Sequence, residues 1–264
     1  MDILNVQNIS IQYGNDPPCV TGVSFDMNEG KIVGIVGESG SGKTTVVRAI
    51  LGLLPGGGKI SEGRVLFNGE DMASYSESRW RDVRGSGISM IFQDSGAMIN
   101  PIRTIGSQYI EYIKIHRPDM SKADAYALAV DTLTKMRLPD GDNIMKSYTY
   151  QLSGGMRQRV GIALAMTFEP KLLLADEPTS AIDVTIQAQI VRQMMELRER
   201  FNTAIVLVTH NIGVAAYMSD EMIVMQYGKV MDRGDRDTVL NHAESEYTRQ
   251  LLQAVPEIGG KRYV

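Results

Sequence analysis

The sequence predicts an α/β fold, built as a parallel β-sheet with helices on both faces, an N-terminal antiparallel β subdomain and an inserted helical subdomain. Three observations support this prediction. Alternating apolar and polar residues open the chain, fully apolar strands alternate with helix-compatible runs further along, and the stretch from about residue 94 to 157 has the spacing of helices. Strands that alternate with helices are typical of parallel sheets, because right-handed crossovers place helices on both faces.

The first third of the chain predicts short strands. Apolar residues recur between turn clusters such as Tyr13–Pro17, which favours half-buried antiparallel strands. Ile32–Val36 differs because it is apolar on both faces, as a buried parallel strand should be. It leads into a glycine-rich loop and a helix-compatible run from Lys43 to about Leu53, and Arg64–Asn68 and Ile88–Phe92 are further expected strands. The recurring apolar positions are Ile3, Val6, Ile9, Ile11, Val23, Phe25 and Met27.

A helical insertion is expected next. Ile105–Ile115 and Ser121–Leu138 have helical spacing, and Ser121 begins a sequence that resembles a capping box. One face of the second helix is expected to carry Tyr126, Val130, Leu133 and Met136. After the insertion the expected order is helix Gly154–Phe168, strand Leu172–Ala175, helix Thr185–Phe201, strand Ala204–Thr209 and a hairpin from Met222 to Asp232.

We therefore expect residues 1–264 to form a single domain. Residues 1–93 and 158–234 would form the core with its β subdomain, residues 94–157 the helical subdomain, and residues 235–264 a tail of short helices with a loose end.

Composition and charge fit an ordinary soluble globular protein. The 264 residues carry 27 basic and 31 acidic side chains, a formal charge of −4, whereas a duplex nucleic-acid binder usually has a basic surface. The apolar runs are shorter than the roughly 18 residues that a membrane span needs. No leader pattern follows Met1, and the single Cys19 excludes an internal disulfide or a cysteine-only metal cluster. We expect a cytosolic protein that binds no nucleic acid.

A loop of the phosphate-binding pattern G-x-x-x-x-G-K-[ST] stands between the strand Ile32–Val36 and a predicted helix. Glycines let backbone N–H groups point toward phosphate oxygens, and the positive end of the helix favours negative charge. Lys43 is expected to neutralise β- and γ-phosphate oxygens, and Thr44 to place its hydroxyl on Mg²⁺. The alternative, a purely structural turn, is disfavoured by the flanking strand and helix. The expected nucleotide-binding residues here are Gly37, Glu38, Ser39, Gly40, Ser41, Gly42, Lys43, Thr44 and Thr45.

Two consecutive carboxylates follow the apolar run Leu172–Ala175, at the strand end where open α/β sheets bind ligands. Asp176 suits Mg²⁺, either directly or through a water. Glu177 could then hold the attacking water as a general base. Acidic residues at a strand end are common, so the pair indicates a nucleotide site only in combination with the phosphate loop.

A second potential phosphate-binding helix start is formed by Ser153, Gly154 and Gly155. Read alone, these residues are a helix cap and a flexible turn. A single nucleotide does not need two such elements from one subunit, so this one is expected to serve the nucleotide of a partner.

Taken in order, these motifs resemble the ATP-binding cassette of ABC transporters. The resemblance extends from roughly Leu4 to Pro256 and implies a P-loop NTPase (RecA-like) fold that uses ATP and Mg²⁺. The motifs that carry it are Gly37–Thr44 (Walker A), Phe92–Asp94 (Q-loop), Leu152–Gln158 (signature), Leu174–Glu177 (Walker B), Ser180–Asp183 (D-loop) and Thr209–Asn211 (H-loop).

Within this family the chain resembles the peptide/nickel importer branch. The segments that carry this likeness are Gln93-Asp94 with Asn100-Pro101 and Thr104-Ile105-Gly106, and the tail Glu246–Pro256. Two positions depart from the pattern: Ile182 replaces the usual leucine of the D-loop, a near-isosteric change, and Thr44 stands where the branch often has serine. Many members carry a cysteine cluster in a longer tail, and without those cysteines no iron–sulfur cluster is expected here.

The resemblance implies roles for single residues. Tyr13 would stack on adenine, although a tyrosine at a strand end is also an ordinary structural feature. Gln93 would touch Mg²⁺ and the attacking water, Glu177 would be the base, and His210 would contact the γ-phosphate. The expected metal-contacting residues are Thr44, Gln93 and Asp176. The residues expected to act across a subunit interface are Ser180, Asp183, Ser153, Gly154 and Gly155.

The resemblance also implies partners. ATP would lie between the Walker A loop of one subunit and the signature of a second homologous ATPase, in a homodimer or heterodimer. Two permease subunits and an extracytoplasmic substrate-binding protein would complete an importer of peptides or nickel complexes, with this chain peripheral on the cytoplasmic face of the membrane. Gln93 and the segment containing Tyr109, Ile110 and Tyr112 are candidates for docking a permease, although these aromatics could equally be core.

A soluble ATPase that acts in DNA repair or translation is the alternative function. Such proteins typically carry a long coiled-coil insertion or two cassettes. The interval between Gln93 and Ser153 is compact, and the chain contains only one set of cassette motifs. Both features disfavour this alternative.

Overall fold

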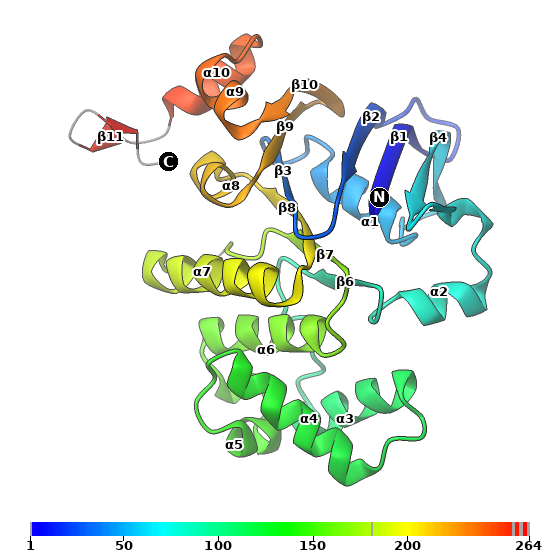
Figure 1. Cartoon of the computed structure of the whole chain (residues 1–264), viewed down its shortest axis with the longest axis vertical. Coiled ribbons are helices and arrows are strands. Elements are labelled where there is room, and N and C mark those ends of the chain that lie inside the picture. Colours follow the sequence, from blue (N-terminus) through cyan, green and yellow to red (C-terminus); the bar gives the residue numbers. More distant parts are fainter. Residues whose placement is uncertain (1, 181, 255–256, 259–260, 263–264) are drawn as a thin grey trace.

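A six-stranded sheet forms the centre of the molecule in the computed structural model, which describes residues 2–180, 182–254, 257–258 and 261–262 (Figure 1). Its strand order is β10-β9-β3-β8-β7-β6, with every pair parallel except the β9–β10 hairpin. The parallel sheet predicted from the sequence is therefore confirmed, with one antiparallel edge strand. The strands are β3 (Ile32–Val36), β6 (Ile88–Ile91), β7 (Leu172–Asp176), β8 (Ala204–Thr209), β9 (Glu221–Gln226) and β10 (Lys229–Asp235).

Both faces of this sheet are buried. Successive side chains of a strand point to opposite faces, so Leu172 and Leu174 pack into one core while Leu173 and Ala175 pack into another. Helix α1 (Lys43–Ile50) fills the first core, between the central sheet and the N-terminal sheet. Helices α6 (Gly154–Met166) and α7 (Val184–Phe201) cover the opposite face.

The N-terminal sheet is antiparallel, as predicted, with the order β2-β1-β4-β5. Its register shifts between Val6 and Ile9, where Asn8 takes a left-handed backbone conformation, so both apolar side chains still face the core. The strand predicted at Arg64–Asn68 is longer, because pairing with β1 extends back to Gly58. The strands are β1 (Leu4–Tyr13), β2 (Val20–Met27), β4 (Gly58–Phe67) and β5 (Glu70–Asp71), and a 3₁₀ turn follows at Met72–Ser74.

The predicted helical region packs as a group of helices against α6, at the end of the molecule away from the N-terminal sheet (Figure 1). Ser121 caps its second helix, since its hydroxyl accepts a hydrogen bond from the Asp124 N–H at 3.1 Å. The predicted apolar face is largely confirmed, since Leu133 and Met136 are buried and Tyr126 and Val130 are half-buried against the same core. The small residues Ala125 and Ala129, which the prediction did not include, are buried as well. The helices are α3 (Ile105–His116), α4 (Lys122–Lys135) and α5 (Gly141–Lys146), with a 3₁₀ turn at Thr149–Gln151.

Three short helices were not predicted, α2 (Glu77–Val83), α5 and α8 (Ile212–Met218). Helix α2 lies in a stretch whose polar composition hides its start, although Ser76 caps it. Helix α5 is only six residues long and has no recognisable period. Short amphipathic segments of this kind are fixed by packing rather than by pattern.

The C-terminal part forms a third small core against the end of β3. Helix α8 (Ile212–Met218) follows β8, and the expected short tail helices are α9 (Arg236–Asn241) and α10 (Glu246–Gln253). Backbone pairing of β11 (Glu257–Ile258) with β12 (Lys261–Arg262) follows, while the rest of the expected loose end lies outside the described residues. Among the described helices, none combines the length and the apolar character needed to cross a bilayer.

The interpretation of Tyr109 as a docking residue is wrong. Its side chain is fully buried and its hydroxyl lies 3.0 Å from the Thr167 hydroxyl, so it belongs to the core of the helical region. Burial raises the pKa of Tyr109 above its usual range. Ile110 is half-buried against the same core, whereas Tyr112 also lines a surface groove.

Candidate active site

The glycine-rich loop joins β3 to α1 at the carboxyl end of the parallel strands. A side chain on Gly37 would place its Cβ 2.1 Å from the Met225 backbone oxygen, so only glycine fits this close approach to β9. Gly42 begins α1 in a left-handed conformation with φ of 100°. The first turn of α1 contains no acidic residue, so its positive end faces the loop without a carboxylate to neutralise it.

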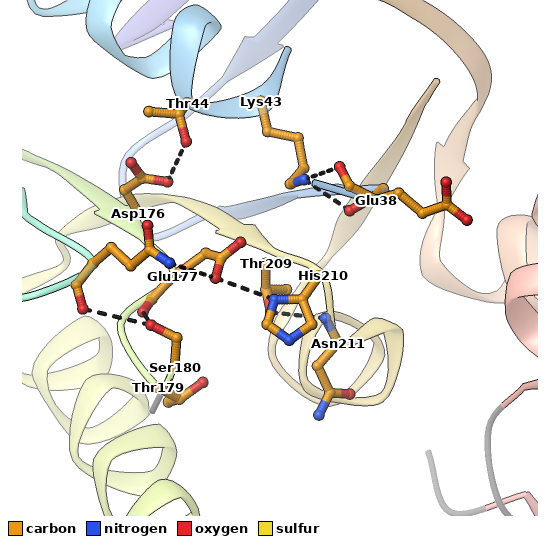
Figure 2. Close-up of polar contacts among 12 residues, drawn as sticks. Glu38, Lys43, Thr44, Asp176, Glu177, Thr179, Ser180, Thr209, His210 and Asn211 are labelled. Carbon is orange, nitrogen blue, oxygen red and sulfur yellow. Dashed lines mark hydrogen bonds and ion pairs between the residues drawn. The ribbon is translucent and has the colours of Figure 1, made fainter. Parts of the chain in front are cut away.

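Lys43 is buried inside the loop. Its Nζ donates to the backbone oxygens of Gly37 and Glu38, both at 2.7 Å (Figure 2). It also donates to the Ser41 hydroxyl at 3.4 Å. Burial lowers the pKa of the Lys43 ammonium, while Glu177 and Asp176 oppose that effect. The positive charge is thus held in one place by loop atoms and by two carboxylates across the site.

Thr44 and Asp176 meet between α1 and the end of β7. The Thr44 hydroxyl donates to Asp176 Oδ1 at 2.9 Å (Figure 2). Burial raises the pKa of the Asp176 carboxyl, and the Thr44 hydrogen bond partly offsets this. One carboxylate and one hydroxyl, both hard oxygen donors beside a phosphate loop, fit the preference of Mg²⁺ for a single protein carboxylate together with substrate phosphates.

The Glu177 carboxylate contacts two other predicted catalytic residues, Gln93 and His210. Gln93 Nε2, just beyond β6, donates to Glu177 Oε2 at 3.3 Å, and His210 Nδ1, just beyond β8, lies 3.1 Å from the same oxygen. When Glu177 is ionised its carboxylate can only accept, so Nδ1 carries the histidine proton. Among the described residues no hydrogen bond reaches Glu177 Oε1, which leaves that oxygen free to accept from water.

The backbone of Glu177 is strained. Its φ of 47° lies in the left-handed region that few residues other than glycine adopt. Its N–H donates to the Val208 oxygen at 2.8 Å, and its C=O accepts from the Ser180 N–H at 3.1 Å. These hydrogen bonds fix the backbone from which the Glu177 side chain extends to Gln93 and His210.

The second helix start is open at the surface. Ser153 caps α6 by accepting from the Met156 N–H at 3.3 Å, and both Ser153 and Gly154 are exposed, while Gly155 is half-buried near Ile186. In the described part of the chain no hydrogen bond joins Ser153 to the phosphate loop. The helix start is therefore available to another molecule, as the interpretation across a subunit interface requires.

The remaining predicted residues lie at the margins of the site. Tyr13 ends β1 half-buried, with its ring against Gly58, and among the described residues no hydrogen bond joins its side chain to the phosphate loop. Thr45 lies half-buried in the first turn of α1, and Glu38, Ser39 and Gly40 form the exposed rim of the loop.

The two predicted D-loop residues make local contacts. The Ser180 hydroxyl donates to the Glu177 backbone oxygen at 3.1 Å, and Asp183 caps α7 by accepting from the Ile186 N–H at 3.0 Å.

Sequence reasoning missed two contacts to the loop from the C-terminal part. The Gly228 N–H donates to the Ser41 oxygen at 3.0 Å, and the Tyr247 hydroxyl accepts from the Glu38 N–H at 3.0 Å. The tail around Tyr247 is distinctive in sequence, but no local signal indicates that it reaches a loop more than 200 residues away.

These contacts define a class of protein: a P-loop ATPase in which a buried lysine, a threonine–aspartate pair and a positioned glutamate meet at one sheet edge. The ABC transporter family matches residues 20–180. The dipeptide transport ATP-binding protein DppD of Escherichia coli is 41% identical over 97% of this chain and 79% of its own length. The oligopeptide transport ATP-binding protein OppD of Haemophilus influenzae is 40% identical over 98% and 80%.

A solved dimeric structure of the ATP-binding cassette MJ0796, in a post-hydrolysis state bound to ADP and phosphate, superposes with a TM-score of 0.77. It is 27% identical, and the match covers 88% of this chain and 98% of that one. The chain therefore belongs to the ABC transporter family, which confirms the resemblance and the ATPase class inferred from the sequence.

Replacing Asp176 by asparagine is expected to stabilise the ligand-free chain at pH 7. Because burial raises the pKa of Asp176 in the folded state, the folded chain binds this proton more tightly than the unfolded chain, and the ionised carboxylate costs stability above the folded-state pKa. Asparagine removes that cost and can still accept from Thr44. Urea unfolding should show a higher midpoint at pH 7, with the gain shrinking as the pH falls through the raised pKa. Asp16→Asn, on an exposed turn, is the control; equal midpoints for both variants would contradict the prediction.

Proposed function

We propose that this chain is the ATP-hydrolysing subunit of a membrane importer of peptides. The observation that carries the catalytic part is the convergence of Gln93 and His210 on Glu177 Oε2, opposite the buried Lys43. The cargo class rests on the relatives, which are dipeptide and oligopeptide transport proteins. Their transport functions also favour this proposal over a soluble role in DNA repair or translation. The names of these relatives favour peptides over nickel complexes as the cargo.

In this proposal the residues of one chain bind and orient ATP. Lys43 neutralises β- and γ-phosphate oxygens, helped by the N–H groups of the loop and the positive end of α1. Thr44 and Asp176 would hold Mg²⁺, with Gln93 close to it, and the ion when bound would offset charge on the phosphate oxygens. Tyr13, at the margin of the site, would contact the adenine.

Glu177 is proposed as the general base. Its Oε1 accepts a proton from the attacking water, while Gln93 and His210 hold Oε2 and so fix the orientation of the carboxylate. The His210 side chain is largely exposed, so the edge of its ring away from Nδ1 would face the γ-phosphate while Nδ1 stays on Glu177. Most of the rate enhancement would come from positioning and from charges that are already in place.

A second homologous ATPase subunit would complete the site. The exposed N-terminal end of α6, with Ser153 and Gly154, supplies N–H groups that the chain's own loop does not use. Ser180 and Asp183 would line the same interface. We propose that residues 94–157 form the lobe that carries this helix start toward the partner when ATP binds.

A groove beside the site would receive a permease. It has a volume of about 480 Å³ and lies among α2, β6, α3 and α6. Phe92 and Ser95 line it, so the segment that carries Gln93 borders both the groove and Glu177. Exposed Met98 and Leu53 offer apolar surface at its edge. Docking there would place the chain on the cytoplasmic face of the membrane, with a binding protein reached through the permeases.

The transport role is tested by purifying the tagged chain from detergent-solubilised membranes. We expect membrane-spanning subunits to purify with it, and the variant Met98→Glu to reduce their recovery because it places a charge in the groove. Ile102→Glu, at an exposed residue outside the groove lining, is the control. Recovery only with ribosomes or DNA would favour the soluble alternative.

Replacing Glu177 by glutamine should preserve ATP binding and lower kcat by about a hundredfold or more, because the amide cannot accept the proton of water. ATP hydrolysis by the assembled complex is the measurement, and Glu199→Gln on the exposed side of α7 is the control. A hydrolysis rate equal to that of the unchanged protein would remove Glu177 from the base role.

Replacing Ser153 by arginine should leave ATP binding to the isolated chain intact and suppress hydrolysis in the assembled complex by roughly a hundredfold, because a bulky side chain at this helix start displaces the partner's nucleotide. Ser121→Arg removes the cap of α4 in the same way and serves as the control. Loss of ATP binding by the isolated Ser153 variant would contradict the proposal that Ser153 contacts the nucleotide held by a second subunit.

A further inference from the structure

The C-terminal helix α10 reaches the phosphate loop through one side chain. Tyr247 is 8% exposed, and its hydroxyl accepts a hydrogen bond from the Glu38 N–H at 3.0 Å. Glu38 follows Gly37 at the start of the loop, so the contact joins the first turn of the tail helix to the entrance of the predicted phosphate site.

This hydrogen bond acts on the peptide group that also holds Lys43. The Glu38 N–H and the Gly37 C=O belong to one planar peptide unit, and they point in opposite directions. The Gly37 oxygen accepts from Lys43 Nζ at 2.7 Å while the N–H of the same plane donates to Tyr247. Rotation of this plane would break both hydrogen bonds, so the tyrosine hydroxyl fixes an acceptor of the lysine ammonium.

Helix α10 is itself firmly held. The Asp232 carboxylate on β10 accepts from the backbone N–H groups of Glu244 and Ser245, at 3.0 Å and 3.1 Å, just before the helix begins. Thr248 is fully buried, and Leu252 packs in the same core as Val36, the last residue of β3 before the loop. The hydroxyl of Tyr247 is therefore carried on a rigid element rather than on a mobile tail.

We infer that Tyr247 is a positioning residue for the phosphate loop, which it holds in the conformation that places Lys43 for the β- and γ-phosphates of ATP. This inference rests on the proposed role of the loop. The loop is rich in glycine and has alternative conformations open to it. A fixed acceptor at its first peptide lowers the cost of ordering the loop when ATP binds.

The test compares Tyr247→Phe with Tyr109→Phe. Each variant removes one hydroxyl that makes a 3.0 Å hydrogen bond from a buried ring, but Tyr109 lies in the helical region away from the loop. Binding of Mg-ATP to the isolated chain and steady-state hydrolysis by the assembled complex are measured, together with amide exchange of the peptide spanning Val36–Gly40 and urea unfolding.

We expect Tyr247→Phe to raise the Kd and the KM for ATP about fivefold, as the loss of one hydrogen bond implies. The kcat should change less than twofold, because the lost contact supports the bound substrate and the transition state equally. The Glu38 amide should exchange faster. Tyr109→Phe should lower the unfolding midpoint without changing the Kd.

An unchanged Kd for Tyr247→Phe would overturn the inference. An equal rise of the Kd in Tyr247→Phe and Tyr109→Phe would also overturn it, because the rise would then come from lower stability of the whole chain. Failure of the unchanged protein to bind Mg-ATP would instead overturn the proposed function of the loop. Asp232→Ala provides an independent route, because loosening the start of α10 should raise the Kd with the Tyr247 hydroxyl still present.

Discussion

Parallel pairing of β6, β7, β8 and β3 is the constraint on which the site depends. These neighbouring strands end at one edge of the sheet, and Gln93, Asp176, Glu177 and His210 lie at or just beyond their ends. The chain segments that meet at Glu177 are 84 and 33 residues away from it in sequence. A shift of one residue in the register of β7 would exchange the directions of Asp176 and Glu177 and would turn its core residues to the wrong faces.

Burial disfavours the charged forms of two groups in the site, the Lys43 ammonium and the Asp176 carboxylate. Burial lowers the pKa of Lys43 and raises the pKa of Asp176, so each neutral form is favoured by desolvation. The opposite charges offset part of this cost, and the left-handed backbone at Glu177 adds strain that the Val208 hydrogen bond has to balance. Under the proposed function, such a site would gain most when a phosphate chain and a cation enter it, since they would supply the missing counter-charges.

Three distant parts of the chain control this edge of the sheet. The segment Phe92–Ser95 borders both the groove and Glu177, the N-terminal end of α6 is exposed, and α10 holds the first peptide of the phosphate loop. If the proposed function is right, changes at the groove and at the helix start would reach the nucleotide through short paths of contacts. The tail helix would have the opposite effect in this proposal, because its hydrogen bond to the Glu38 N–H holds one side of the phosphate loop in place.

The sequence by itself determined the α/β class, the antiparallel first sheet, the phosphate loop and the carboxylates at the end of β7, because these depend on local periodicity and on motifs within a few residues. Pattern also indicated the helical region and the buried Leu133 and Met136 at the end of α4, but it did not single out the small residues Ala125 and Ala129, which are buried more fully than Tyr126 and Val130. Only the tertiary structure decided that Tyr109 is core, that Gln93 and His210 share one oxygen of Glu177, and that Tyr247 reaches Glu38. Those contacts join residues far apart in the chain, and their geometry follows from strand order and helix packing rather than from any local signal.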